Sequence, residues 1–179
     1  MKYLCKECGE ITNIRANSKN SASPVCEKCG KRLYKRDIIK SKKQIKNAAW
    51  EAFSDYIRVR DCLKTTGKVD RGVCYTCGRE LPIKDLQAGH MVSGRKNFSL
   101  FDEDNVKAQC FCCNVKEHGM QGEFVINRID ELMEEEGLSV EEALEYVRER
   151  FEYKEVEYSI EDLVSIMNEY ISKLEDLVN

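Results

Sequence analysis

Residues 74–118 combine two Cys-x-x-Cys pairs with both histidines of the chain. Cys74 and Cys77 open this stretch, and Cys110 and Cys113 close it. Four thiolates from two tight turns can hold one tetrahedral zinc ion, and a site closed in this way is structural. Such an ion would fix both ends of the intervening loop. The spacing therefore predicts a zinc-stapled core that brings the polar side chains of the loop together.

Four polar residues of this stretch have the chemistry of a one-metal nuclease. His90 can take a proton from water, because imidazole titrates near neutral pH. Asn105 can orient this histidine or hold its loop through the side-chain amide. A helix that begins after Cys113 would place Asn114 and His118 on one face, as ligands of a Mg²⁺ or Mn²⁺ ion that binds the scissile phosphate. Turn and helix-cap chemistry is the alternative explanation for the two asparagines.

Two short strands and one long helix are predicted to position these residues. Residues 86–92 form a strand that carries His90, and residues 106–109 form a second strand that enters Cys110. Ser41 is a predicted N-cap for a helix over residues 41–62. Apolar residues repeat at helical spacing along this helix: Ile45, Ala48, Ala49, Ala52, Phe53, Tyr56 and Ile57.

A second set of paired cysteines, Cys5, Cys8, Cys26 and Cys29, has the spacing of a zinc ribbon. A glycine follows each pair and allows backbone N–H groups to approach the thiolates. The segment has almost no hydrophobic core, so it should fold only with metal. A redox pair is the alternative, but two matched motifs favour a metal.

Two of the ten cysteines remain outside these quartets. Cys62 lies near the end of the predicted helix and is expected to be a small buried filler. Cys112 competes with Cys113 for the second zinc ion. We assign Cys113, because it keeps the Cys-x-x-Cys spacing of the other three pairs.

The composition indicates a protein of a reducing cytoplasm. The N-terminus has no apolar leader, and no apolar run approaches the length of a membrane span. In that compartment paired cysteines indicate metal binding rather than disulfides. We therefore expect two structural zinc ions, a cytoplasmic location and no membrane.

Charge is strongly segregated along the chain, although the net charge is only -3. Residues 1–50 carry 13 Lys or Arg and 4 Asp or Glu, whereas residues 120–179 carry 5 and 18. A basic front half predicts contact with a polyanion such as DNA, and two solvated faces are the alternative. The candidate phosphate contacts are Lys42, Lys43, Lys46, Arg95 and Lys96.

The chain from residue 123 is predicted to be helical and acidic. Ser139 with Glu142 forms a capping box for a helix to about residue 150, and Ser159 with Asp162 caps a last helix. Residues 151–158 are either a short strand or a linker. The apolar stripe of the last helix serves either intramolecular packing or a homodimer seam, and consists of Leu163, Met167, Tyr170 or Ile171, Leu174 and Val178.

Residues 58 to about 122 resemble the NinG (Rap) recombination proteins of lambdoid phages, which belong to the HNH and endonuclease VII group. The resemblance extends to the N-terminal cysteine segment and the C-terminal helix. The residues that carry it are Ile57 to Cys62, Cys74-x-x-Cys77-Gly78, Ala88-Gly89-His90, Gly94-Arg95, Phe101-Asp102-Glu103-x-Asn105-Val106, Gln109-Cys110-x-x-Cys113-Asn114 and His118-Gly119.

The resemblance implies a nuclease for branched or recombining DNA, acting alongside other recombination proteins. It also implies that Asn114 binds the catalytic metal, because in endonuclease VII an Asn directly follows the last zinc cysteine. In many HNH enzymes an Asp or another ligand directly precedes the catalytic histidine, where this chain has Gly89. NinG-type sequences usually have Asp three residues before the histidine, where this chain has Gln87. Asp85 and Asp104 are candidate substitutes.

Together these observations predict an α+β fold: a small zinc-stapled ββα-metal (HNH-like) core with an N-terminal zinc ribbon and a helical C-terminal tail. The predicted divisions are a ribbon at 1–36, a basic helix and loop at 37–72, a nuclease core at 73–122 and an acidic tail at 123–179. The expected function is a Mg- or Mn-dependent endonuclease for a Holliday junction or D-loop. The alternatives are a non-catalytic junction-binding protein, a generic HNH endonuclease on linear duplex and a zinc-ribbon adaptor.

Overall fold

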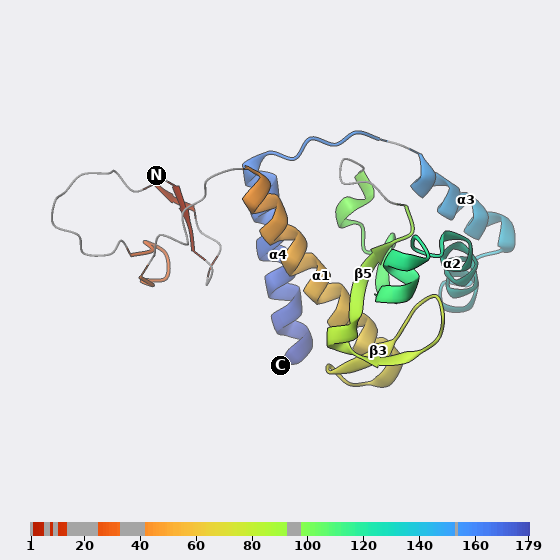
Figure 1. Cartoon of the computed structure of the whole chain (residues 1–179). Coiled ribbons are helices and arrows are strands. Elements are labelled where there is room, and N and C mark those ends of the chain that lie inside the picture. Colours follow the sequence, from red (N-terminus) through yellow and green to blue (C-terminus); the bar gives the residue numbers. More distant parts are fainter. Residues whose placement is uncertain are drawn as a thin grey trace. The chain divides into compact units, whose positions relative to one another are not determined.

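The computed structural model describes residues 2–5, 8, 11–13, 25–32, 42–92, 98–152 and 154–179. The chain divides into two compact units (Figure 1). One unit comprises residues 1–53 and 158–173, and the other comprises residues 54–157 and 174–179. Within the described residues, no helix is both long enough and apolar enough to cross a bilayer.

The N-terminal segment contains a small antiparallel hairpin of β1 (Lys2–Leu4) and β2 (Ile11–Asn13). An isolated antiparallel bridge joins Val25 to Arg32 and closes a tight turn between them. This pattern of short hairpins around cysteines agrees with the predicted ribbon, although Gly9 and the residues between Asn13 and Val25 lie outside the described part.

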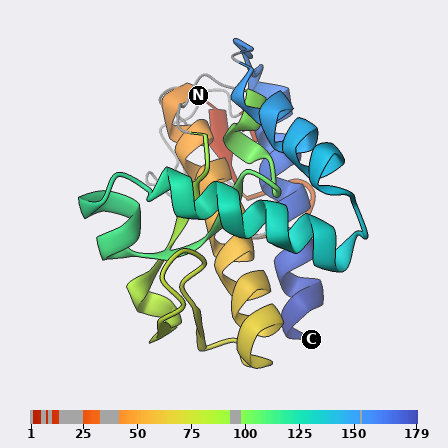
Figure 2. The same cartoon turned by 90° about the vertical axis from the view of Figure 1, so that its right-hand side faces the viewer.

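Helix α1 (Lys42–Thr66) extends the predicted helix by four residues at its C-terminal end. Its N-cap candidate Ser41 lies outside the described residues. In the first unit, Phe53 of α1 packs edge-on against Tyr170 of α4 (Ile160–Val178), with ring centroids 4.7 Å apart. The two helices therefore lie side by side in Figures 1 and 2.

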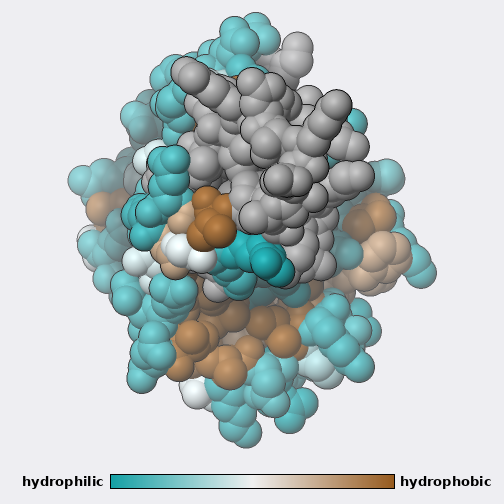
Figure 3. Space-filling view, turned by 90° about the vertical axis from the view of Figure 1, so that its left-hand side faces the viewer, coloured by the Kyte–Doolittle hydropathy of each residue, from teal (hydrophilic) through white to brown (hydrophobic). Residues whose placement is uncertain are grey.

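The start of α4 follows the predicted cap, because Asp162 N donates to Ser159 Oγ at 3.0 Å. Leu163, Met167 and Tyr170 are buried, so this part of the apolar stripe packs within the protein. Val178 is 54% exposed. Figure 3 shows hydrophobic side chains at several places on one face, most of them in the lower part of the view.

The second unit contains two antiparallel pairs of strands. β3 (Arg71–Val73) pairs with β4 (Glu80–Pro82), and β5 (Leu86–His90) pairs with β6 (Val106–Cys110). Short 3₁₀ turns occupy Ile83–Asp85 and Phe98–Phe101. The predicted strand pair is thus confirmed, with β5 ending at His90 itself.

The last turns of α1 hold β6 in place. The Asp61 carboxylate accepts the Ala108 N–H at 2.6 Å, and Arg60 donates to the Val106 carbonyl at 3.1 Å. All five residues of β6 are buried, including Lys107 and Gln109. A fully buried strand needs such partners, because an unpaired backbone group away from water costs free energy.

Helices α2 (Gln121–Glu135) and α3 (Val140–Phe151) pack against each other (Figures 1 and 2). Phe124 and Leu132 of α2 share a buried cluster with Ala143 and Val147 of α3. The predicted capping box is present at the start of α3, formed by Ser139 and Glu142. Among the described residues of 151–158, Glu155 alone has a strand-type contact, and this is an isolated bridge.

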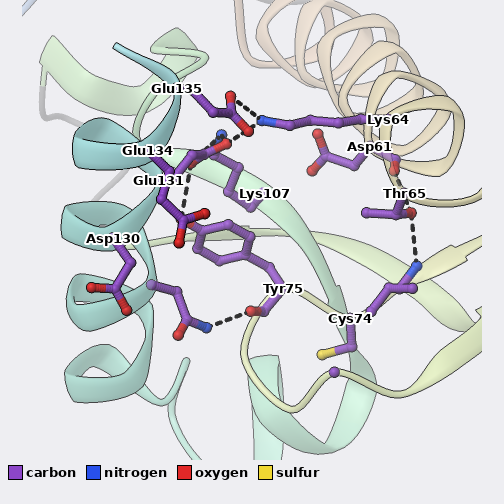
Figure 4. Close-up of a pocket in the computed structure, with 13 residues that line it drawn as sticks. Asp61, Lys64, Thr65, Cys74, Tyr75, Lys107, Asp130, Glu131, Glu134 and Glu135 are labelled. Carbon is purple, nitrogen blue, oxygen red and sulfur yellow. Dashed lines mark hydrogen bonds and ion pairs between the residues drawn. The ribbon is translucent and has the colours of Figure 1, made fainter. Parts of the chain in front are cut away.

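A charged cluster joins α2 to the strands. Glu131 accepts from Lys107 at 3.0 Å and from Tyr75 Oη at 3.0 Å, and it pairs with Arg128 at 2.9 Å. Glu131, Lys107 and Tyr75 border a pocket of about 320 Å³, in which Lys64 of α1 also reaches Glu131 and Glu135 (Figure 4).

Candidate metal centres and catalytic site

The structure contains two clusters of four cysteines that could each hold a zinc ion. Cys5, Cys8, Cys26 and Cys29 form the first, and Cys74, Cys77, Cys110 and Cys113 form the second. Within each cluster the sulfur atoms all lie within 4.8 Å of one another. This is the donor set of a closed structural zinc site, so the cysteine assignment is confirmed as metal-binding geometry.

The two clusters contain the same tight turn, a zinc knuckle, in which the glycine after the second cysteine bonds back to the carbonyl of the first cysteine. Gly30 N donates to Cys26 O at 2.8 Å, and Gly78 N donates to Cys74 O at 2.9 Å. Both glycines have a left-handed backbone, with φ of 73° and 69°. A residue with a side chain would be strained in this conformation, which explains the glycine after Cys29 and Cys77.

Hydrogen bonds and charge stabilise thiolates in the core cluster. Cys74 Sγ accepts the Cys110 N–H at 3.2 Å, and Arg79 lies 3.6 Å from Cys110 Sγ. Burial alone would raise the pKa of Cys74, but bonds from Thr76 and nearby backbone N–H groups lower it to about 6. Cys112 does not belong to the cluster, so the choice of Cys113 is confirmed.

Cys62 is a buried thiol with no place in either cluster. Its side chain packs with Leu86 and Ala108 in the core, and it is 0% exposed. Burial, with a contribution from Asp61, raises its pKa to about 11. A thiol in this environment is unreactive, in agreement with the predicted role as filler.

His90 lies at the end of β5, where its ring is held by the backbone. Nε2 lies 3.2 Å from the carbonyl oxygen of Leu100. A carbonyl only accepts hydrogen bonds, so Nε2 carries the proton and Nδ1 is the nitrogen that can accept one. This arrangement suits a general base with a fixed ring orientation.

Asn105 connects the two ends of the segment between β5 and β6. Its Oδ1 accepts the Val92 N–H at 2.8 Å, and its Nδ2 donates to the carbonyls of Val92 and Ser99 at 3.1 and 3.0 Å. The side chain is 0% exposed. Of the two roles considered for Asn105, these bonds favour holding the loop, with His90 positioned indirectly.

Replacement of Asn105 by Ala should therefore destabilise the protein by about 2–3 kcal/mol, because the buried Ser99 carbonyl and two part-buried backbone groups of Val92 lose their partner. Urea unfolding would measure this change. Asn127→Ala is the matched control. The Asn127 side chain donates one hydrogen bond among the described residues, to the Tyr75 carbonyl, and the loss of this bond should cost about 1 kcal/mol. Equal effects of the two substitutions would contradict the structural role of Asn105.

Asn114 and His118 do not share a regular helix, which corrects one expectation. After Cys113 the chain forms a π-helical segment, Cys112–Lys116, and not an α-helix. His118 follows this segment, is exposed, and has a left-handed φ of 52°. The next residue, Gly119, lies against the carbonyl oxygen of His90, so the turn of His118 still borders the site.

The residues around Asn114 include two glutamines whose roles the sequence did not indicate. Gln87 of β5 stands opposite Gln109 of β6. Gln87 Oε1 accepts from Asn114 Nδ2 at 2.8 Å and thereby turns Asn114 Oδ1 toward Gly89. A polar residue in the interior of a buried strand is the signal that could have identified Gln109.

Of the two candidate carboxylates, Asp104 forms ion pairs and hydrogen bonds with other residues, and Asp85 is exposed on a turn. Asp104 pairs with Arg128 at 3.0 Å and also accepts from Tyr146 and Arg150. Asp85 is exposed on a 3₁₀ turn. In the part of the chain that the structure describes, neither histidine belongs to a group of three or more His, Cys, Asp or Glu side chains able to hold a metal.

The predicted phosphate contacts are only partly described. Lys42 and Lys43 are exposed on the first turn of α1. Lys46 lies over the ring of Tyr158, with Nζ 5.8 Å from the centroid. Arg95 and Lys96 fall outside the described residues.

The fold and the clusters define an α+β protein with small two-stranded sheets and two four-cysteine sites suited to zinc. A family model described as "NinG: Bacteriophage Lambda NinG protein" matches residues 2–179. The chain therefore belongs to the NinG family of bacteriophage proteins. No curated protein and no solved structure matches it.

Proposed function

We propose that this protein is a metal-dependent, structure-selective DNA endonuclease with an HNH-like core, acting on Holliday junctions or D-loops in phage recombination. One observation supports the activity above all others. His90 ends β5, Asn105 directly precedes β6, and Asn114 lies in the π-helical turn after β6; β5 pairs with β6, and the core cysteine cluster includes Cys110 at the end of β6 and Cys113 in that turn.

In this proposal His90 is the general base. Its Nε2–H is held by the Leu100 carbonyl, and Nδ1 is the atom that would take the proton of the attacking water. Asn105 fixes the backbone that carries the histidine, through its bonds to Val92 and Ser99. A base that is already oriented loses little conformational freedom when the substrate binds.

The residues around Asn114 fit a hard divalent cation. Asn114 Oδ1 faces the space beside Gly89, and amide oxygens are suitable ligands for Mg²⁺ or Mn²⁺. A bound cation would supply Lewis-acid stabilisation of the phosphate and the leaving oxygen. His118, the other predicted ligand, lies directly before Gly119, whose carbonyl oxygen accepts from Gln109 Nε2 at 2.9 Å.

DNA is the proposed partner, and the basic surface at the start of α1 would contact its phosphates. Lys42 and Lys43 are exposed there, and each neutralised phosphate steepens the salt dependence of binding. Symmetric cutting of a junction needs two active sites, so we extend the proposal to a homodimer. Sedimentation of the zinc-loaded protein would measure its mass.

The decisive experiment compares a labelled four-way junction with a linear duplex of the same sequence, for the wild type and His90→Ala. Cleavage is expected to need Mg²⁺ or Mn²⁺, to prefer the junction, and to fall by about 10² to 10⁴-fold in His90→Ala. The metal-free control should omit the cation rather than add a chelator, because a chelator would remove zinc and unfold the sites.

Other outcomes would identify a different function. Equal cutting of junction and duplex would indicate a generic HNH endonuclease. Tight junction binding without cutting, with either metal, would indicate a non-catalytic binding protein. This second candidate is favoured by Gly89, because the position before His90 offers no carboxylate.

A further inference from the structure

Two side-chain oxygen atoms from other elements face Gly89, at the place where a side chain on this residue would lie. A Cβ atom built on Gly89 would lie 1.9 Å from Gln109 Oε1 and 2.8 Å from Asn114 Oδ1. Both oxygens therefore face the same small volume. Gly89 is not among the glycines with a left-handed φ, so its backbone would accept another residue. The neighbouring oxygens are what require a glycine here.

Gln109 is held so that its oxygen points into this volume. Its Nε2 donates to the Gly119 carbonyl at 2.9 Å and to Thr76 Oγ1 at 3.3 Å. Because a carbonyl only accepts, the amide cannot be turned round without losing this bond. The side chain is 0% exposed, and no donor among the described residues reaches its Oε1.

A buried carbonyl oxygen without a donor is unfavourable unless something electropositive fills the space in front of it. A second amide oxygen, from Asn114, faces the same place and cannot donate. Two converging acceptors repel each other, whereas a cation attracts both. Amide oxygens are also the ligands that hard divalent ions accept.

We propose that Gln109 binds the divalent cation through Oε1, together with Asn114 Oδ1, and takes the place that a carboxylate at position 89 would occupy. This inference rests on the nuclease proposal for the identity of the site, and it adds a ligand that the sequence did not indicate. Gln87 acts as a positioning residue, because it orients the Asn114 amide.

Neutral ligands have a consequence for the order of binding. Two amide oxygens contribute no net charge, so the cation binds weakly to the protein alone. A DNA phosphate would add the missing negative charge, as substrate phosphates do in many Mg²⁺ sites. Metal affinity is therefore expected to increase when DNA is present.

The test measures Mn²⁺ binding by electron paramagnetic resonance of the full, zinc-loaded chain, with and without junction DNA. The variants are Gln109→Ala, Gln109→Met, Gly89→Asp and the double variant Gly89→Asp/Gln109→Ala. Gln109→Met keeps the volume of the side chain but removes its oxygen. The matched control is Gln121→Ala, since Gln121 also donates to a backbone carbonyl, that of Met91, at 2.9 Å. Zinc content and circular dichroism verify folding.

Both Gln109 variants should lower Mn²⁺ affinity by about tenfold or more, and Gln121→Ala should leave it unchanged. Gly89→Asp alone should also lose binding, because its Cβ collides with Gln109. The double variant gives the introduced carboxylate room and should restore binding. It should also bind Mn²⁺ more tightly than the wild type when DNA is absent.

The result separates this inference from the nuclease proposal. Unchanged Mn²⁺ affinity in folded Gln109→Met would overturn the inference and indicate that a water molecule fills the space, whether or not the wild type cuts DNA. Loss of Mn²⁺ binding in this variant, with a wild type that binds Mn²⁺ but never cuts, would sustain the metal site and refute the nuclease.

Discussion

Cys113→Ser is expected to lose the core zinc ion and to unfold the β5–β6 region, whereas Cys112→Ser keeps both. The physical reason lies in the composition of the core. The buried cluster consists of Cys62, Leu86 and Ala108 together with three cysteines of the candidate zinc site, Cys74, Cys110 and Cys113. Few purely apolar side chains remain there to hold the strands if the metal is absent.

The expected magnitude is large. Structural zinc contributes roughly 10–16 kcal/mol of apparent binding free energy in small zinc domains, which exceeds the net stability of most domains. Thermal unfolding would measure the change in stability, and inductively coupled plasma mass spectrometry would measure the number of zinc ions per chain. Two zinc ions per chain and an unaltered melting temperature in Cys113→Ser would refute the cluster.

Cys112→Ser is a demanding control, because the two cysteines are adjacent in the chain. Cys112 is half-buried and packs on the same core, but its sulfur lies outside the cluster. A generic effect of a serine in this turn would lower stability in both variants. Loss of zinc in only one of them identifies the ligand.

The cysteine clusters and the strand pair could be predicted because their signals are local. Cys-x-x-Cys-Gly determines a knuckle within five residues, and Gly78 has the left-handed backbone that this turn requires. The capping box of Ser139 and Glu142 is local in the same way. The segment Leu86 to Val92 was predicted as a strand that carries His90, although its last residue could be found only from the pairing with β6.

The environment of Asn114 could not be predicted, because it depends on contacts between distant residues. The helical period after Cys113 suggested one face for Asn114 and His118, but the chain makes a π-helical turn and then a left-handed residue. Gln109 and Asn114 both approach Gly89 because β6 pairs with β5. Similarly, Asp61 meets Ala108 across 47 residues.

Charge totals do not show which acidic side chains of α2 are buried. Residues 120–179 carry a large excess of acidic side chains, for which a solvated face was one explanation. One of these residues, Glu131, is only 10% exposed and lies against Lys107 of β6. Counting charges along the chain cannot reveal such a pair, because the partners are 24 residues apart and meet only after α2 packs on the strands.

Glu131→Ala is expected to destabilise the protein by about 3–5 kcal/mol, because it leaves the buried Lys107 without its carboxylate partner and removes one of the carboxylates that pair with the buried Arg128. The side chains of Lys107 and Arg128 are only 8% and 4% exposed. Tyr75 would also lose the acceptor of its hydroxyl group. Figure 4 shows Glu131 between Lys107 and Tyr75. Urea unfolding at neutral pH would measure the loss.

The same cluster predicts a pH dependence of stability. Burial alone would raise the pKa of Glu131, but Lys107, Lys64 and Arg128 lower it from 4.5 to about 2. A depressed pKa means that the folded protein holds its carboxylate more firmly than the unfolded chain does. This contribution is complete above pH 4.5 and is lost as the pH falls toward 2. The wild type should therefore lose stability over this range, and Glu131→Ala should lose less.

Glu134→Ala provides the matched control, because Glu134 lies on the same helix, borders the same pocket and is exposed. Its removal should change the free energy of unfolding by no more than about 0.5 kcal/mol. Similar losses in both variants would mean that helix propensity, rather than the buried pairs, determines the effect. A much larger loss in Glu131→Ala, combined with a flatter acid profile, would show that α2 is fixed to the strands by this carboxylate.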